Sequence, residues 1–307
     1  MPGTETPAVW WALLVPVVLA AFALVAAMLD SVAAARLAGA ARGGWAVPVR
    51  ETGRLLLKQR RTVLLPDAPL WRLGGAGVIV AACTASVVIP VGRSAAADLS
   101  VGVIWWSAFL ALLWVLMHML GYSANAPFPL IAGYRFLAQA MAYEMPLAIS
   151  IICAALAAHS LQVGQVVAAQ HGLWFGVWMP AAFVIFLICG MAAAFYGPFA
   201  TPTGADVGGG VVAESSGVDR LLVLAGRYCI LASVAGFGAA MFLGGGAGPW
   251  LPPAVWTAVK TVALLAVMVA ARWRWPLLRM DRFEEVAWTV LLPVSLVQAL
   301  VVSLVVL

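Results

Sequence analysis

The stretch GYSANAPFPLIAGYRFLAQAMAYEMPLAIS, residues 121–150, decides the fold prediction. It begins as a polar loop broken by prolines and continues as an apolar helix that contains one acid, Glu144. If the apolar span begins at Ala132, Glu144 lies about 18 Å into a hydrocarbon layer roughly 30 Å thick. An ionisable group near the bilayer midplane costs at least roughly 2.5–3.5 kcal/mol on insertion scales. The position of Glu144 therefore predicts a role in handling protons or ions.

Composition places the whole chain in a membrane. Of its 307 residues, 64% are hydrophobic and 9% are charged, whereas soluble domains are about 45–50% apolar and about 25% charged. We expect an all-α polytopic membrane protein, with residues 1–307 forming a single integral membrane domain. Eight apolar runs are long enough to span, so both termini lie on one side. The runs are 8–29, 74–92, 101–120, 132–158, 173–195, 220–243, 254–271 and 286–307.

The basic residues are concentrated on one side of the predicted membrane protein. The side formed by the loops after the first, third, fifth and seventh spans, together with the span ends that adjoin them, holds fifteen of the 17 lysines and arginines. The other loops hold Arg93 alone, and Lys260 lies within a span. The positive-inside rule makes the basic side cytoplasmic, which predicts a plasma (inner) membrane protein with both termini outside. The fifteen are Arg36, Arg42, Arg50, Arg54, Lys58, Arg60, Arg61, Arg72, Arg135, Arg220, Arg227, Arg272, Arg274, Arg279 and Arg282.

Three segments on the basic side are too polar to span the bilayer. Residues 45–72 contain an amphipathic helical piece, VPVRETGRLLLKQRR, which we expect to lie on the inner surface because its basic residues recur every four positions. Residues 196–219 are rich in glycine, threonine and proline and are expected to form a cytoplasmic loop. Residues 272–285 form the densest charge cluster and are expected to be a third cytoplasmic loop.

Few polar residues are expected inside the membrane. Arg135 and Gln139 share one face of the helix that carries Glu144, and Glu144 lies opposite. Two opposed polar faces suggest that other helices enclose this span, and Pro146 should kink it. The simpler alternative is that Glu144 only bonds a neighbouring helix. Lys260 either snorkels outward or needs an acid or a water-filled path, and a link to Glu144 is one hypothesis.

No motif for a bound cofactor stands out. The cysteines, Cys83, Cys153, Cys189 and Cys229, stand singly in apolar runs, which is typical of small buried thiols. Metal-ligand spacings and phosphate loops are absent from the sequence, so we expect no cofactor bound by this chain and no nucleic-acid partner. From the residues alone, a proton-handling subunit and a small secondary transporter fit equally well.

The stretch 121–150 resembles the signature of the H subunit (subunit 1) of respiratory complex I, the NADH–quinone oxidoreductase. That signature reads roughly G-W-x-S-N-x-K-Y-x-L-x-G-x-x-R-x-x-A-Q-x-x-S-Y-E-x-P-L. The matching positions are Gly121, Ser123, Asn125, Leu130, Gly133, Arg135, Ala138, Gln139, Tyr143, Glu144, Pro146 and Leu147. FLGGGAGPWLPPAVWTAVK, ending at Lys260, and RWRWPLLRMDRF, from Arg272, are similar to two further motifs of the family.

The resemblance implies a membrane subunit that forms the membrane side of a quinone chamber and begins a buried charge chain. Other membrane-arm and peripheral-arm subunits, quinone and membrane lipid would be its partners. NAD, FMN and iron–sulfur clusters would sit on partner subunits, and the isolated chain would catalyse nothing. The charge chain would include Glu144, Lys260 and Tyr143. The chamber or inner face would include Arg135, Gln139, Asp206, Glu214, Arg227, Arg272, Arg279 and Asp281.

The chain departs from the family pattern at the basic side. Most acids of the family's inner loop are absent from residues 196–219, and Arg227 stands where the family has an acid. The chain therefore resembles a divergent paralogue. Three alternatives stay open: the membrane anchor of an energy-converting hydrogenase, a stand-alone proton-coupled transporter that uses Glu144, and a purely structural anchor.

Overall fold

A computed structural model describes residues 10–39, 44–61, 63–92 and 94–306. The predicted start of the first span at Ala8, and two of the sorted basic residues, Arg42 and Arg93, lie outside the described residues. Within those ranges the regular secondary structure is helical, as expected for an all-α membrane protein.

Helices of spanning length form most of the fold. They are α1 (Trp10–Leu37), α3 (Ala68–Ser86), α4 (Gly102–Ser123), α5 (Pro127–Ala158), α9 (Gly217–Leu243) and α10 (Pro253–Arg274). A seventh runs from α11 (Met280–Val286) through a π-helical turn, η5 (Ala287–Leu291), into α12 (Leu292–Val306). Shorter helices are α2 (Val47–Leu57), α6 (Val163–Ala169), α7 (Phe175–Trp178) and α8 (Pro180–Ala193).

The prediction of one continuous span over 173–195 is wrong in detail. Met179 has a non-helical backbone, with φ −122° and ψ 59°, and Pro180 follows it, so the segment divides into α7 and α8. The 14 residues of α8 reach about 21 Å, which is less than the hydrocarbon thickness of about 30 Å. In the described ranges, seven helices are therefore long enough to cross a membrane, and α8 is a shorter apolar helix. Pro146 does not interrupt α5.

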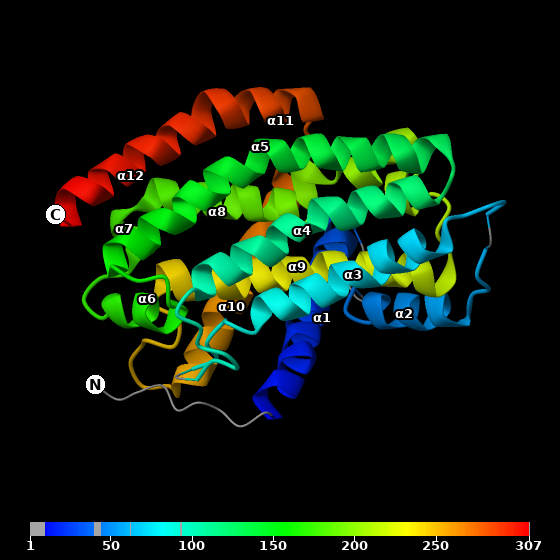
Figure 1. Ribbon diagram of the computed structural model, residues 1–307. Helices are drawn as coiled ribbons and strands as arrows, with labels where there is room; N and C mark the ends of the chain where they lie inside the picture. Colours follow the sequence, from blue (N-terminus) through cyan, green and yellow to red (C-terminus); the bar gives the residue numbers. More distant parts are fainter. Residues whose placement is uncertain (1–9, 40–43, 62, 93, 307) are drawn as a thin grey trace.

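The helices pack around α9. Figure 1 shows α3, α4 and α5 running side by side, with α9 behind them and α11–α12 along the outer side of α5. Every residue of α9 from Cys229 to Phe242 is buried. Small residues permit this packing: a side chain at Gly238 would meet the ring of Phe186, and one at Gly226 would meet Val78. Because α9 contacts many elements, the end at which it begins, near Gly217, can carry side chains to a shared site.

The loops of the predicted cytoplasmic side lie together at one end of the bundle. The Asp67 N–H donates to the Ser123 carbonyl at 3.0 Å, which joins the first loop to the α4–α5 turn. The Leu278 N–H donates to the Pro198 carbonyl at 2.8 Å, which joins the two later loops. The amphipathic helix is shorter than the predicted piece, since α2 ends at Leu57 and Lys58 is extended. Residues 196–219 form four 3-10 turns before α9 begins, namely η1 (Gly197–Phe199), η2 (Thr201–Thr203), η3 (Ala205–Val207) and η4 (Gly210–Val212).

Candidate functional site

A cavity of about 540 Å³ lies at the end of the bundle that carries these loops. Its walls come from α1, α2, α9 and the last turn of α10. Most of the lining is apolar, with Ala23, Ala27 and Leu224 among the wall residues. Four charged residues also line the cavity, and they are Asp30, Glu51, Arg227 and Arg272. An apolar space with a few convergent polar groups is the usual form of a small-molecule site.

Asp30 is the centre of the polar network in this cavity. The residue is 5% exposed, and its carboxylate pairs with the Arg272 guanidinium. The Tyr228 hydroxyl donates to Asp30 Oδ2 at 2.7 Å, and Trp273 Nε1 donates to Oδ1 at 3.1 Å. One carboxylate on α1 therefore accepts hydrogen bonds from both α9 and α10, and hydrogen bonds to a charged acceptor are the strong ones. This network fixes the orientation of all four side chains.

Sequence reasoning missed Asp30. Hydropathy ends the first apolar run at residue 29 and so assigns this acid to the first loop, whereas α1 continues to Leu37. The signal in the sequence is the lack of a helix breaker after Leu29, because the segment DSVAAARL contains neither glycine nor proline. Continuing the helix through this segment places Asp30 inside it.

Arg227 enters the same cavity without a matching acid. Its Nε is buried and has no hydrogen-bond partner in the described part of the chain. The guanidinium lies over the ring of Tyr228, 5.3 Å from the centroid, and 5.9 Å from that of Tyr196. Burial, together with the nearby charge of Asp30, raises the pKa of the Tyr196 phenol, so Tyr196 stays neutral. Arg227 is left as a positive group with free donors.

Gln139 and Arg135 connect α5 to the loop 196–219. Gln139 is 1% exposed, and its Nε2 donates to the carbonyls of Ala192 at 2.7 Å and Phe199 at 3.1 Å. The Thr201 hydroxyl donates to Gln139 Oε1 at 2.8 Å. One turn earlier, Arg135 pairs with Asp206 at 2.5 Å. The structure thus brings together three of the predicted inner-face residues, and their contacts hold the loop in place.

Glu144 lies near the middle of α5 and is partly buried. Its two neighbours in sequence differ in exposure, since Met145 is 52% exposed and Tyr143 is 2% exposed. The expectation that other helices enclose this span on all sides is wrong for the chain alone, because α5 has an exposed apolar strip. That strip consists of Ile131, Tyr134, Met141, Met145 and Ile152. Glu144 borders this strip, so its carboxyl group lies at the edge of the bundle.

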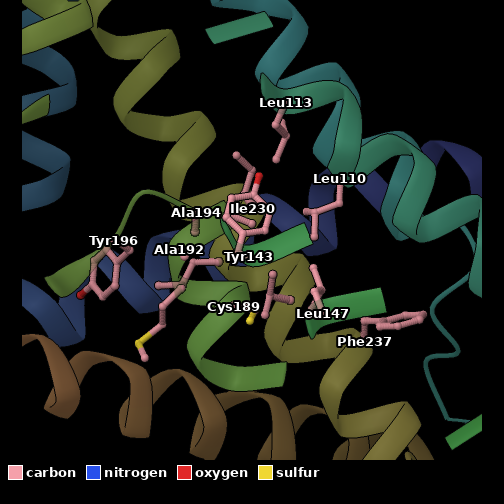
Figure 2. Close-up of a cluster of buried hydrophobic side chains, with 14 of the residues drawn as sticks. Leu110, Leu113, Tyr143, Leu147, Cys189, Ala192, Ala194, Tyr196, Ile230 and Phe237 are labelled. Carbon is pink, nitrogen blue, oxygen red and sulfur yellow. The ribbon is translucent and has the colours of Figure 1, made fainter. Parts of the chain in front are cut away.

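Tyr143 points the other way, into the core. Figure 2 shows its ring surrounded by apolar side chains from several helices, among them Leu110, Leu147 and Ile230. Its hydroxyl is buried and has no hydrogen-bond partner in the described residues. An unpaired buried hydroxyl is costly and calls for an explanation, such as an ordered water. The predicted site residues Tyr143 and Glu144 therefore face different surroundings.

Lys260 binds backbone rather than an acid. Its Nζ donates to the Leu243 carbonyl at 2.6 Å and to the Ala247 carbonyl at 2.7 Å. The ammonium also lies 4.5 Å from the centroid of the Trp174 ring. Leu243 is the last residue of α9, where a cation is favoured by the free carbonyls and the helix dipole. No ion pair joins Lys260 to Glu144 among the described residues, so the hypothesis of a direct link finds no support.

The remaining predicted residues lie outside the cavity. Arg279 and Asp281 pair with each other at 2.9 Å on the exposed start of α11. Glu214 is partly buried beside the start of α9. In the described ranges, no group of three or more His, Cys, Asp or Glu side chains is arranged to hold a metal ion. Of the predicted inner-face set, the cavity receives only Arg227 and Arg272.

The fold defines a polytopic helical membrane protein with a cavity at its basic end. The NADH dehydrogenase family model matches residues 8–303. The chain is 33% identical over 265 residues to the first H subunit of the NADH-quinone oxidoreductase of Geobacter metallireducens, a match that covers 83% of this chain and 80% of that protein. The chain belongs to the NADH dehydrogenase family.

Two further relatives show a similar match. The H subunit of the NADH-quinone oxidoreductase of Geobacillus kaustophilus is 33% identical over 270 residues, covering 86% of this chain and 81% of that protein. The second H subunit of the same oxidoreductase in Cereibacter sphaeroides is 35% identical over 259 residues, covering 83% and 81%. These matches confirm the resemblance to the H subunit of complex I.

Proposed function

We propose that this chain is the membrane subunit of a proton-translocating NADH–quinone oxidoreductase and that it forms the membrane side of the quinone chamber. The observation that carries the proposal is the 540 Å³ cavity between α1, α2 and α9. The relatives named above are H subunits of such oxidoreductases. Quinones combine a polar ring with an apolar tail, and the cavity offers both kinds of wall.

The chemistry of the lining supports a quinone as the ligand. The alanines and leucines of α1 and α9 suit an isoprenoid tail. Arg227 has free N–H donors for a quinone carbonyl, which can only accept hydrogen bonds. Arg272 forms an ion pair with Asp30, so the two charges nearly cancel at that point of the cavity. By resemblance, Arg227 replaces an acid of the family, so this chamber would favour a ligand with hydrogen-bond-accepting oxygens more strongly.

We further propose that Glu144 is the protonatable group that begins the charge chain. Its place in the middle of α5 supports this role, because a carboxyl group within a spanning helix can take and release a proton where an alcohol or amide cannot. Tyr143 is adjacent, and its hydroxyl is unpaired within the described residues. Lys260 would join the chain only through water or through another subunit, since its ammonium already binds two carbonyls.

Electron transfer would take place on partner subunits. In this proposal, NADH, FMN and iron–sulfur clusters belong to the peripheral arm, and this chain supplies the quinone chamber and the proton path. The positive-inside rule would place the cavity end in the cytoplasm and both termini outside the plasma membrane. The exposed apolar strip beside Glu144 is then a natural contact for another membrane-arm subunit.

Purification of the tagged chain from its native membrane in mild detergent tests the proposal. Mass spectrometry should identify iron–sulfur, flavin and antiporter-like subunits, and the preparation should reduce quinone with NADH. Recovery with a nickel-containing hydrogenase would assign the chain to that assembly instead. Recovery as a stable solitary protein with proton-linked uptake would overturn the proposal in favour of a transporter.

A further inference from the structure

A second polar site lies around the start of α3, beside a different face of α9 from the one that lines the quinone-chamber candidate. The connection after α2 is fixed there by three contacts. Arg60 Nε donates to Asp219 Oδ2 at 2.9 Å, and its Nη2 donates to Oδ1 at 2.5 Å. The Arg61 N–H donates to the Ser216 hydroxyl oxygen at 2.5 Å. These contacts hold Arg60 and Arg61 against the start of α9.

Gly217 makes this close approach possible. Its φ of +58° is in the left-handed region that favours glycine. A Cβ at this position would lie 2.6 Å from the Lys58 carbonyl oxygen. The connection and the start of α9 therefore touch backbone to backbone, which makes the site a built part of the fold.

Arg60, Arg61 and Arg72 line one cavity of about 170 Å³. Asp219 is the acid in this lining, and Arg60 occupies both of its carboxylate oxygens. In the described part of the chain, neither Arg61 nor Arg72 takes part in an ion pair. The cavity therefore presents two guanidinium groups whose donors are free, and their fork geometry fits a phosphate or a carboxylate.

A second cavity of about 200 Å³ continues from the first and shares Arg60, Trp71, Arg72 and Asp219 with it. Its deeper walls are apolar and come from α3, α4 and α9. A side chain added at Gly75 would meet nothing within 4 Å, so the space beside this glycine is open. The remaining apolar lining is Ala76, Leu120, Val218 and Leu222.

The apolar cavity borders an exposed apolar surface of α3, a helix long and apolar enough to cross a membrane. Ala76 is exposed at its edge, and Leu73 and Val80 on the same side of α3 are 57% and 61% exposed. These positions continue one apolar face along a spanning helix. A ligand with a phosphate and a hydrocarbon chain would satisfy both parts of the site, whereas a free anion would leave the apolar part empty.

We propose that this two-part cavity binds one anionic phospholipid of the cytoplasmic leaflet, with its phosphate between Arg61 and Arg72 and an acyl chain beside Gly75. Basic pockets between membrane helices on the cytoplasmic side are suited to such lipids. An acidic segment of a partner protein would match the charge but would not enter the apolar part. The site is separate from the quinone chamber and does not depend on quinone chemistry.

Native mass spectrometry of the purified assembly in nanodiscs tests this site. The lipids are phosphatidylcholine alone or phosphatidylcholine mixed with phosphatidylglycerol, and the readout is the phosphatidylglycerol retained on release. Arg61→Gln combined with Arg72→Gln should weaken retention about 25-fold, at roughly fivefold for each charge. Arg50→Gln, an exposed arginine of α2 away from both cavities, is the control and should have no effect.

The second variant separates the two parts of the site. Gly75→Leu adds a side chain whose Cβ meets nothing within 4 Å, and it should also reduce phosphatidylglycerol retention while leaving the arginines unchanged. Equal retention by the wild type and the double arginine variant would overturn the proposal. Displacement of the lipid from the wild type by millimolar inorganic phosphate would also overturn it, because that result indicates a free-anion site. Cross-linking of Arg72→Cys to an acidic segment of another subunit would overturn it as well.

Discussion

Tyr228 on α9 donates its hydroxyl hydrogen to Asp30 on α1 at 2.7 Å. The two residues are far apart in sequence, and their contact closes one wall of the chamber. Arg272 and Trp273 bind the same carboxylate from α10. The chamber is therefore shaped by a shared acid that fixes three helices relative to one another, and its geometry depends on that acid.

Replacing this acid should weaken the chamber. Asp30→Asn leaves the Arg272 guanidinium without its counter-charge at a partly buried position, and we expect a loss of about 3 kcal/mol in the free energy of unfolding. Denaturant titration in bicelles measures the change. Glu51→Gln is the matched control, because Glu51 pairs with Arg54 on the exposed surface and such pairs contribute about 0–1 kcal/mol. Equal destabilisation by both variants would contradict the account.

Arg227 should affect quinone affinity more than turnover. In Arg227→Gln the free guanidinium donors are lost from the cavity, so the KM for a short-chain quinone should rise by about tenfold, the equivalent of one hydrogen bond to a charged donor. The kcat should change much less, and Arg227→Lys should recover part of the affinity. A fall in kcat at constant KM would assign Arg227 to another step.

Gln139 should stabilise the loop 196–219. Gln139→Leu leaves two carbonyls and the Thr201 hydroxyl without partners in a buried place, and this should cost about 1–3 kcal/mol. Limited proteolysis should then cut the loop faster. The control is Gln165→Leu on the exposed side of α6, for which the proteolysis rate should be unchanged. A loop equally resistant in both variants would show that other contacts hold it.

Substitutions of Lys260 distinguish a role as a helix cap from a role in the charge chain. Lys260→Met removes the donor to Leu243 and Ala247 and should lower the free energy of unfolding by about 1–3 kcal/mol. Lys260→Arg keeps donors and should recover most of this stability. If Lys260→Met loses proton translocation at unchanged stability, Lys260 belongs to the charge chain and not to the cap.

Glu144 should be required for proton movement. Glu144→Gln keeps the size of the side chain but cannot release a proton, and in proteoliposomes of the assembly it should reduce NADH-driven proton uptake by about tenfold or more. Glu144→Asp keeps a carboxyl group and should retain part of the uptake. Wild-type uptake by Glu144→Gln would support a purely structural anchor.

The membrane class and most of the helices can be predicted from the sequence, because spanning helices need long apolar runs that are visible without tertiary information. Their packing is harder to predict. The sequence does not predict Asp30 as a site residue, because hydropathy alone ends the first helix before it, whereas α1 continues to Leu37. Lys260 is expected either to snorkel outward or to need an acid or a water-filled path, yet its ammonium donates to backbone carbonyls at and after the end of a neighbouring helix. Such contacts join residues through tertiary structure and have no local pattern.

Photolabelling with an azido-quinone tests the central claim most directly, namely that the cavity between α1, α2 and α9 holds quinone. The purified assembly is labelled with and without excess unlabelled quinone, and labelled peptides are mapped by mass spectrometry. We predict labels within residues 20–34, 47–55 and 221–229, and excess quinone should suppress them. Labels confined to other parts of this chain, or labels in these segments that excess quinone does not reduce, would contradict the account.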